Sequence, residues 1–368
     1  MTILILTNND AGLYRFRKEL LVELLKENDV HVSLPNGKMI NKLEKLGCII
    51  HKTPISRHGT NPFQDFKLFR LYKKILKSVN PDVVLTYTVK PNVYGGLACS
   101  HLKIPYIANI TGLGNSIENP GIVQKIVLFL YKKGLKKAST VFFQNKENME
   151  FMIEHKIVRD NSVLLPGSGV NLQENKYEEY PLDDSRLVFV TIGRILKDKG
   201  IDELLAAAKT IKKEYNNVVF KVVGSFDGNY EIIINNAVKK GVIEYLGYRD
   251  DIHNIIKHSH ATIHPSYHEG TSNVLLETAA CGRPILASNI SGCNNVFDET
   301  TGIPFEPKNV ESLVLAIKKF IMLPNNERAE MGKKGRKKVE IEFGKSIIIN
   351  DYIKAINNIK RGLGNEII

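Results

Sequence analysis

Two glutamates, Glu269 and Glu277, stand on either side of a short polar segment, and their carboxylates are suited to holding hydroxyl groups. Between them lie Gly270, Thr271, Ser272, Asn273 and Val274. This pattern predicts a helix that begins near residues 272–274, where unpaired backbone N–H groups can bind an anion. Glu277, in the first turns of that helix, can accept two hydrogen bonds from the vicinal hydroxyls of a ribose, and Glu269 can hold sugar hydroxyls. The alternative for either acid is a surface carboxylate or a helix-capping glutamate.

Two cations precede this unit by about 70 residues. Arg194 and Lys199 follow an apolar run at 187–192 and stand directly before a segment that predicts a helix from about Ile201. Two cations beside a helix N-terminus make a diphosphate site that needs no metal, although a solvated basic loop would look the same in the sequence. The chain has no D-x-D triplet, so no metal-dependent diphosphate site is predicted.

Short apolar runs alternate with amphipathic segments along the whole chain, which predicts an α/β protein with two Rossmann-like, doubly wound domains facing a central cleft. The predicted strands are 2–8, 31–34, 49–53, 82–87, 105–110, 140–144, 162–165, 187–192, 218–223, 243–246, 262–264, 284–287 and 303–305. The predicted organisation is an N-terminal domain (1–167), a polar linker (168–185), a C-terminal domain (186–345), and a C-terminal helix with a tail (346–368) that packs back toward the first domain.

Composition excludes several classes of protein. The 368 residues are 43% hydrophobic and 24% charged, which is typical of globular domains rather than of disordered chains. Four cysteines without metal-ligand spacing, no signal-peptide pattern and no apolar run of about 18 residues predict a cytoplasmic protein that does not span the membrane. The net charge is +12, and residues 1–170 hold 24 basic and 13 acidic side chains, so the first half is expected to face an anionic partner.

The Glu269–Glu277 spacing, together with Gly193-Arg194 and Lys199-Gly200, resembles glycosyltransferase family 4, whose members are retaining enzymes of the GT-B fold. The resemblance implies that Arg194 and Lys199 neutralise the diphosphate of a UDP-sugar and that no metal or other cofactor is used. It further implies that Glu277 binds the ribose and Glu269 the donor sugar, so that Arg194, Lys199 and Glu269 form the catalytic set. The base-binding wall of the family falls near Tyr248 and Arg249, and its glycine loop beside the donor phosphates falls at Gly12.

Three segments of the first half, 56–62, 90–95 and 111–114, resemble a subgroup that elongates polyprenyl-diphosphate-linked saccharides in capsule, O-antigen and other surface glycans, such as bacterial N-acetylgalactosaminyltransferases. The resemblance implies a hexosyltransferase that uses a UDP-sugar and an undecaprenyl-diphosphate-linked acceptor. Arg15, Arg17, Arg57 and Asn92 are the candidate acceptor-binding residues.

Residues 122–137 form a basic amphipathic segment with five lysines. A helix of this kind can lie on an anionic membrane surface, which would make the enzyme peripheral on the inner face of the cell membrane. The alternative is a core-packing helix with a lysine-rich outer face.

Two other functions remain open from the sequence. One is a UDP-sugar epimerase of the same fold, and the other is a basic nucleic-acid-binding module, which ranks lower because no groove-reading or aromatic-interleaved motif is present. The chain has neither G-x-G-x-x-G after its first strand nor a P-loop. His58, His264 and His268 lie near predicted loops, but the pattern assigns none of them as a base.

Overall fold

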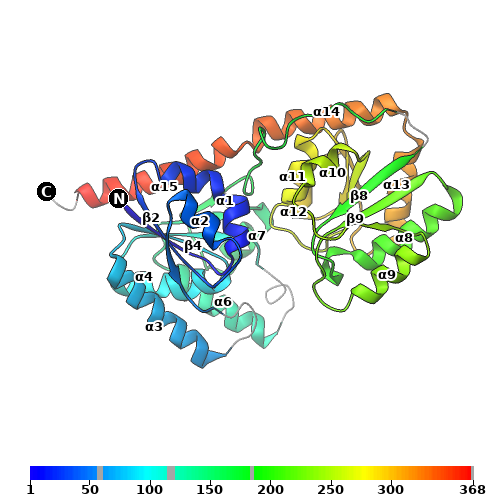
Figure 1. Cartoon of the computed structure of the whole chain (residues 1–368). Helices are drawn as coiled ribbons and strands as arrows, with labels where there is room; N and C mark the ends of the chain where they lie inside the picture. Colours follow the sequence, from blue (N-terminus) through cyan, green and yellow to red (C-terminus); the bar gives the residue numbers. More distant parts are fainter. Residues whose placement is uncertain (56–60, 114–120, 183–185, 366–368) are drawn as a thin grey trace. The chain divides into compact units, whose positions relative to one another are not determined.

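The computed structural model describes residues 1–55, 61–113, 121–182 and 186–365 (Figure 1). The chain divides into two compact units. Unit 1 contains Met1–Ser168 and Ser346–Ile368, and unit 2 contains Gly169–Lys345. Each unit is a parallel sheet with helices on both faces, which is the α/β class that the sequence predicts.

Within the described residues, the sheet of unit 1 has seven parallel strands in the order β3-β2-β1-β4-β5-β6-β7. They are β1 (Thr2–Leu6), β2 (Asp29–Leu34), β3 (Ile49–Lys52), β4 (Val83–Tyr87), β5 (Tyr106–Ile110), β6 (Thr140–Phe143) and β7 (Ser162–Leu164). The helices are α1 (Asp10–Leu24), α2 (Ile40–Leu46), α3 (Pro62–Val79), the single π-helical turn η1 (Pro91–Gly95), α4 (Gly96–Leu102), α6 (Ile122–Leu135), α7 (Lys146–Glu154) and α15 (Lys345–Asn365).

The central strand β1 shows how one sheet supports two cores. Ile3 and Ile5 point to one face, where they join a cluster with residues of α1 and α15. Leu4 and Leu6 point to the other face and pack with residues of α3, α4 and α6. All four side chains are fully buried, so this strand reads as a continuous apolar run, as expected for a parallel sheet that is covered on both sides.

Helix α1 begins at Asp10. The side chain of Asn9 accepts a hydrogen bond from the backbone N–H of Gly12 at 3.1 Å and so caps the helix. Gly12 therefore lies in the first turn of α1 and not in an open loop, so the loop expected there is wrong, while the place of Gly12 beside the donor phosphates stays a prediction. The corrected position places the N-terminus of α1 directly after β1.

The C-terminal helix α15 is part of the core of unit 1. Tyr352 is fully buried, its hydroxyl donates to Asn109 Oδ1, and its ring centroid lies 4.8 Å from that of Phe142. Ile348 and Ile356 bury the same face of the helix. The predicted return of the C-terminal helix to the first domain is thus explained by one apolar stripe with a buried hydrogen bond.

Within the described residues, the sheet of unit 2 has six parallel strands in the order β10-β9-β8-β11-β12-β13. They are β8 (Leu187–Ile192), β9 (Val218–Val223), β10 (Glu244–Tyr245), β11 (Ala261–His264), β12 (Ile285–Ser288) and β13 (Gly302–Phe305). The helices are the 3₁₀ turn η2 (Lys197–Lys199), α8 (Ile201–Glu214), α9 (Glu231–Lys239), α10 (Ile252–Lys257), α11 (Asn273–Ala280), α12 (Ser291–Asn294), α13 (Val310–Met322) and α14 (Asn325–Glu342).

The segment predicted as a linker (168–185) is described up to residue 182, and residues 169–182 pack along unit 2. The buried guanidinium of Arg283 donates to the backbone carbonyls of Glu178 and Glu179, each at 2.8 Å, and Arg336 donates to the carbonyl of Asn175 at 2.9 Å. These charge-assisted hydrogen bonds fix the segment to the surface of unit 2.

Among the residues that the structure describes, no helix combines the length and the apolar character that crossing a bilayer requires. The four cysteines are free thiols, and each is buried.

Replacing Tyr352 with alanine is expected to lower the free energy of unfolding by about 3–5 kcal/mol, because it deletes a buried ring and leaves a cavity. Urea unfolding followed by circular dichroism measures the change. Lys354→Ala on the exposed side of α15 is the matched control, expected to shift the free energy by less than about 0.5 kcal/mol. Equal effects of the two substitutions would contradict the packing of α15 in the core.

Candidate functional site

The residues predicted to bind a diphosphate lie where the strand order of unit 2 reverses. Strand β8 is the first strand of this sheet in the chain, with β9 on one side and β11 on the other. Gly193 and Arg194 follow β8, and Pro265 follows β11, so both loops leave the same edge of the sheet. Open α/β sheets bind their ligands at this kind of position, outside the carboxyl ends of the strands.

Close backbone contact brings these two loops together. Gly200 ends the 3₁₀ turn η2 with a φ of +67°, and a Cβ there would come within 2.0 Å of the carbonyl oxygen of Pro265. The backbone N–H of Tyr267 donates to the carbonyl of Asp198 at 2.9 Å. Only glycine fits both the left-handed backbone at position 200 and the close approach to the carbonyl of Pro265. Lys199, the preceding residue, therefore lies directly against the loop that follows β11.

A cluster of one cation, one carboxylate and one imidazole forms at this junction. Lys199 Nζ forms an ion pair with Glu269 Oε1, and it also lies 3.4 Å from Ser266 Oγ. His264 Nε2 lies 2.9 Å from the same Glu269 oxygen and 3.1 Å from Ser272 Oγ. Because a carboxylate oxygen only accepts, His264 carries a hydrogen on Nε2 and donates a hydrogen bond to Glu269.

The electrostatics of the cluster keep Glu269 ionised. Burial alone would raise the pKa of the carboxyl group, whose side chain is 15% exposed. The ammonium of Lys199 and the hydrogen bond from His264 outweigh that effect and hold the pKa of Glu269 well below its usual range. Glu269 therefore acts as a hydrogen-bond acceptor near neutral pH and not as a proton donor.

Arg194 stands at the rim of the same junction. Together with Gly193, Lys199 and His264 it lines a small cavity at the ends of β8 and β11. Its side chain is 61% exposed, and its Nη1 atom pairs with Asp227 Oδ2 at 2.5 Å. The two predicted cations therefore face one cavity, and Arg194 is the one that solvent reaches more easily.

Helix α11 begins beside Glu269, close to the predicted start. Ser272 is its N-cap residue, and Thr271 and Ser272 are buried. The backbone N–H of Ser272 donates to the carbonyl of Gly292 at 3.1 Å, which anchors the turn that carries Gly270. Asn273 and Val274 form the first turn, and half-buried Glu277 lies one turn further on. The positive end of the helix dipole is thus fixed next to the charge cluster.

Tyr248 and Arg249 follow β10 and lie on the surface. The guanidinium of Arg249 makes two hydrogen bonds of 2.7 Å with Asp251, and these bonds lower the pKa of Asp251 to about 2. The hydroxyl of Tyr248 donates to Asp250 at 3.0 Å. Both side chains thus pair with acidic residues of their own loop, and their role in binding the base stays a prediction.

The candidate acceptor residues of unit 1 separate into three groups. Arg15 is exposed on α1. Arg57 lies outside the described residues. Arg17 and Asn92 are buried, with 5% and 1% of their surface exposed. These two belong to the interior of the unit, so we leave them out of the acceptor site.

Specific contacts hold both buried side chains. The guanidinium of Arg17 stacks over the rings of Tyr87 and Tyr352 at 5.7 and 5.8 Å. Asn92 accepts a hydrogen bond from Thr86 Oγ1 at 2.6 Å and donates to the carbonyl of Asn109 at 2.8 Å. Both side chains therefore stabilise the core, which corrects the expectation that they contact an acceptor.

Sequence reasoning did not assign His264, Ser266 and Asp227 to the site. His264 is the last residue of β11, at the carboxyl edge of the sheet, and Asp227 lies in the loop after β9. Their positions after neighbouring strands are the signal that points to them. Over the described residues, no group of three or more His, Cys, Asp or Glu is placed to hold a metal ion.

Two protein-family models match the chain, one in each unit. Residues 2–145 match the model of glycosyl transferase 4-like proteins, and residues 173–338 match the model of glycosyl transferases group 1. The chain belongs to the glycosyltransferases. Solved structures support the GT-B fold: Anabaena HepE, determined in complex with UDP and glucose, has a TM-score of 0.79 at 16% identity and covers 97% of this chain and 99% of its own.

Two curated relatives are similar over most of their length. The N,N'-diacetylbacillosaminyl-diphospho-undecaprenol alpha-1,3-N-acetylgalactosaminyltransferase of Campylobacter jejuni is 29% identical over 98% of this glycosyltransferase and 99% of the relative. The capsular polysaccharide biosynthesis glycosyltransferase CapM of Staphylococcus aureus is 26% identical over 88% of each chain. These matches give no support to the epimerase or to the nucleic-acid-binding module.

Replacing Lys199 with methionine is expected to destabilise unit 2 by about 2 kcal/mol at pH 7, because Glu269 then stays partly buried without its cation. The pKa of Glu269 should rise in the variant, since burial is no longer offset. In the wild type Glu269 stays ionised and paired down to well below pH 4, because its folded-state pKa is strongly lowered. In the variant Glu269 takes up a proton once the pH falls below its raised pKa, which removes the cost of the unpaired charge, so the difference between variant and wild type should shrink as the pH falls from 7 to 4.5.

Urea unfolding at pH 7, 5.5 and 4.5 measures this trend. Lys197→Met is the matched control, because Lys197 is exposed in the same 3₁₀ turn. A difference that does not depend on pH would contradict the assigned electrostatic role of Lys199.

Proposed function

We propose that this protein transfers a sugar from a UDP-sugar to a polyprenyl-diphosphate-linked saccharide, with retention of configuration, in the assembly of a bacterial surface polysaccharide or lipid-linked glycan. The observation that carries the proposal is the cluster of Lys199, Glu269 and His264 at the reversal of strand order in unit 2, with Arg194 on the same cavity. The Campylobacter relative acts on a diphospho-undecaprenol-linked sugar, which supports the acceptor class, and the Staphylococcus relative takes part in capsular polysaccharide biosynthesis, which supports the product class.

In this proposal the donor binds along the carboxyl edge of the sheet of unit 2. Arg194, Lys199 and the first-turn N–H groups of α11 hold the diphosphate, since helix N-termini and paired cations both favour anions. Glu277 accepts hydrogen bonds from the ribose, and Glu269 accepts them from the donor sugar. The remaining donor contacts on unit 2 are those predicted from the sequence: Tyr248 and Arg249 for the base, and Gly270, Thr271, Ser272, Asn273 and Val274 for the phosphates and sugar.

The chemistry of transfer places negative charge on the departing UDP. Two fixed cations stabilise the transition state more than the ground state, because the charge on the leaving oxygen grows as the glycosidic bond breaks. The proposed metal-independent reaction uses these cations in place of a divalent ion. The strongly lowered pKa of Glu269 makes its carboxylate a weak base. We therefore infer that the leaving phosphate oxygen accepts the proton of the acceptor hydroxyl.

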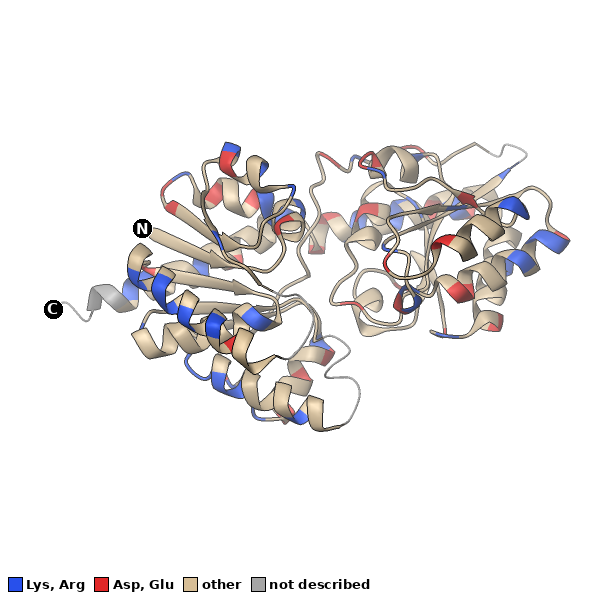
Figure 2. Ribbon diagram, turned by 60° about the horizontal axis from the view of Figure 1, so that its bottom comes forward, with Lys and Arg blue, Asp and Glu red and all other residues tan. Residues whose placement is uncertain are grey.

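Helix α6 supports a contact with an anionic membrane. Val127, Tyr131 and Leu135 are buried in unit 1, yet the outer face is not simply lysine-rich. Four apolar side chains lie exposed on it: Ile122, Val123, Ile126 and Phe129. Exposed lysines flank this stripe at positions 125, 132, 133, 136 and 137. Blue positions also follow the helices of unit 1 in Figure 2, and apolar residues among lysines favour a helix lying in a headgroup layer.

Arg194→Ala is expected to lower the rate of transfer by about 10²–10³-fold, equivalent to about 2.7–4 kcal/mol of barrier, if the guanidinium stabilises the leaving diphosphate. Arg194 is largely exposed, so the fold should be unaffected. UDP release is measured with a panel of UDP-sugars and an undecaprenyl-diphosphate-linked N-acetylhexosamine as acceptor.

Lys197→Ala, one turn away, is the control and should retain the wild-type rate. Equal rates in wild type and Arg194→Ala would overturn the phosphate assignment. An epimerised UDP-sugar formed without acceptor would overturn the transfer itself.

Replacing Ile122, Ile126 and Phe129 together with serine should reduce binding to vesicles that contain phosphatidylglycerol by about tenfold or more, because each exposed apolar side chain contributes roughly 1.5–3 kcal/mol when it is fully buried in the bilayer. Sedimentation with vesicles measures the bound fraction. The control replaces exposed apolar residues of unit 2, Ile232 and Leu315, with serine and should bind as wild type. Undiminished binding of the α6 variant would exclude this helix as the membrane contact.

A further inference from the structure

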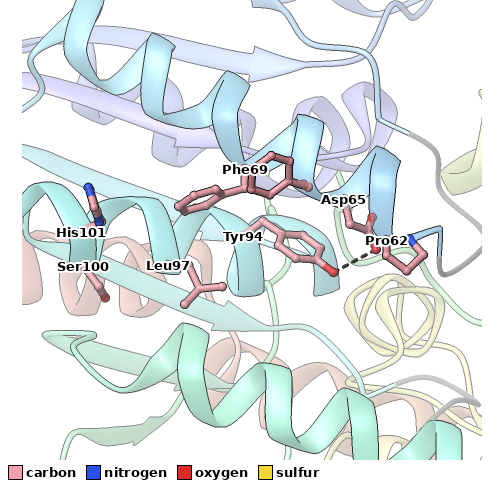
Figure 3. Close-up of a pocket in the computed structure, with 8 residues that line it drawn as sticks. Pro62, Asp65, Phe69, Tyr94, Leu97, Ser100 and His101 are labelled. Atoms are coloured by element: carbon pink, nitrogen blue, oxygen red, sulfur yellow. Dashed lines mark hydrogen bonds between the residues drawn. The ribbon is translucent and has the colours of Figure 1, made fainter.

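An open groove runs along unit 1 between α3 and the segment formed by η1 and α4 (Figure 3). Its volume is about 560 Å³, within the range of about 300–1,000 Å³ that is typical of sites for small molecules. The lining residues are Pro62, Asp65, Phe66, Phe69, Tyr94, Leu97, Ser100 and His101. Carbon atoms of aromatic and aliphatic side chains make up most of this surface, so the groove fits an apolar ligand.

Polar side chains line both ends of the groove: Ser100 and His101 lie at one end, and the other end lies near the carboxyl edge of the sheet. Asp65 and Tyr94 line this end, and the hydroxyl of Tyr94 donates to Asp65 at 2.9 Å, as Figure 3 shows. Lys90, which follows β4, forms an ion pair with Asp65 at 2.8 Å and offsets its charge. Strand β4 is the neighbour of β1 at the point where the strand order of unit 1 reverses. This edge is where an open α/β sheet binds the reacting part of a ligand.

The rim of the groove is apolar and basic together. Phe66 is 60% exposed, and Phe63 is 88% exposed one turn before it. Arg70 lies over the ring of Phe66 at 5.9 Å, and Lys73 lies over the ring of Phe69 at 5.6 Å. Long cationic side chains that cover aromatic rings in this way suit the boundary between acyl chains and anionic headgroups. Helix α6, with its exposed apolar stripe, packs against α4, so both features lie on the same side of the sheet.

We propose that this groove binds the first isoprene units of the polyprenyl chain of the acceptor and leads its diphosphate to the carboxyl edge of the sheet. The proposal deepens the proposed function and rests on it for the identity of the lipid. The diphosphate of a polyprenyl acceptor must reach that edge to react, whereas the headgroup of an ordinary phospholipid takes no part in the reaction. The groove thus assigns Phe66, Phe69 and Leu97 to recognition of the lipid rather than of the sugar.

A fluorescent reporter tests occupancy without requiring catalysis. The chain has no tryptophan, so His101→Trp adds a single reporter at one end of the groove. Emission should shift to shorter wavelength with vesicles that contain undecaprenyl diphosphate. Vesicles of matched charge, made with phosphatidylglycerol alone, should give a smaller shift. Leu315→Trp, on the exposed surface of unit 2, is the control reporter and should not distinguish the two vesicles.

An equal shift of His101→Trp with both vesicles would assign the groove to ordinary acyl chains and overturn the proposal, as would the absence of any shift. This readout stands apart from sugar transfer. If the enzyme transfers sugar but the His101→Trp emission does not respond, the proposal for the groove is wrong and the proposed function stands. If the emission responds but no sugar is transferred, the proposed function is wrong and the groove still binds the lipid.

A kinetic comparison tests the same residues in the working enzyme. Phe66→Ser should raise the ratio of KM for an undecaprenyl-diphosphate-linked acceptor to KM for the same saccharide linked to a methyl diphosphate by about tenfold, because only the polyprenyl chain fills the groove. The control Leu315→Ser should leave the ratio unchanged. An unchanged ratio in Phe66→Ser would overturn the proposal.

Discussion

The ion pair between Lys199 and Glu269 is the interaction on which the site of unit 2 depends. It joins the loop after β8 to the loop after β11, and it exists only because Gly200 lets the two backbones approach. A partly buried carboxylate is costly without a partner, so Lys199 and His264 together fix its position and its charge. The same contacts that stabilise the junction thereby place a cation and an acceptor group at the edge of the sheet.

The strand order explains why chemistry gathers at two places in this chain. In each unit the first strand lies in the middle of the sheet, and the chain then builds outward on one side before it crosses to the other. The loops after β8 and β11 meet at one reversal, and those after β1 and β4 meet at the other. Parallel strands present all their carboxyl ends at one edge, so side chains that are far apart in the sequence, such as Lys199 and Glu269, become neighbours without long connecting structure.

The strands and the donor-side motif could be predicted from the sequence because both depend on local pattern. Both ends of every predicted strand lie within two residues of the ends of an observed strand. Helix α11 begins at Asn273, inside the range 272–274 that the polar residues after Glu269 predict. The burial of Arg17 could not be predicted, because the ring that covers it, that of Tyr352, arrives from a helix more than 300 residues later. Asn92 shows the same limit, since its partners Thr86 and Asn109 lie on two different strands. The local sequence shows that such side chains are polar, but it does not show whether distant segments of the chain bury them.

Helix α6 illustrates how one element can serve two environments. Its inner stripe packs into unit 1, and the backbone of Gly134 lies so close to η1 that a Cβ would come within 2.7 Å of Val93 Cα. That close fit fixes the rotation of the helix, and therefore decides which residues are left outside. Helix α6 is apolar on more than one face, so Ile122, Ile126 and Phe129 remain in contact with solvent after the inner face is packed. In that position they do not stabilise the fold. A membrane beside this face would bury these side chains without changing the core. The proposed membrane contact and the packing of the fold therefore use different side chains of the same helix.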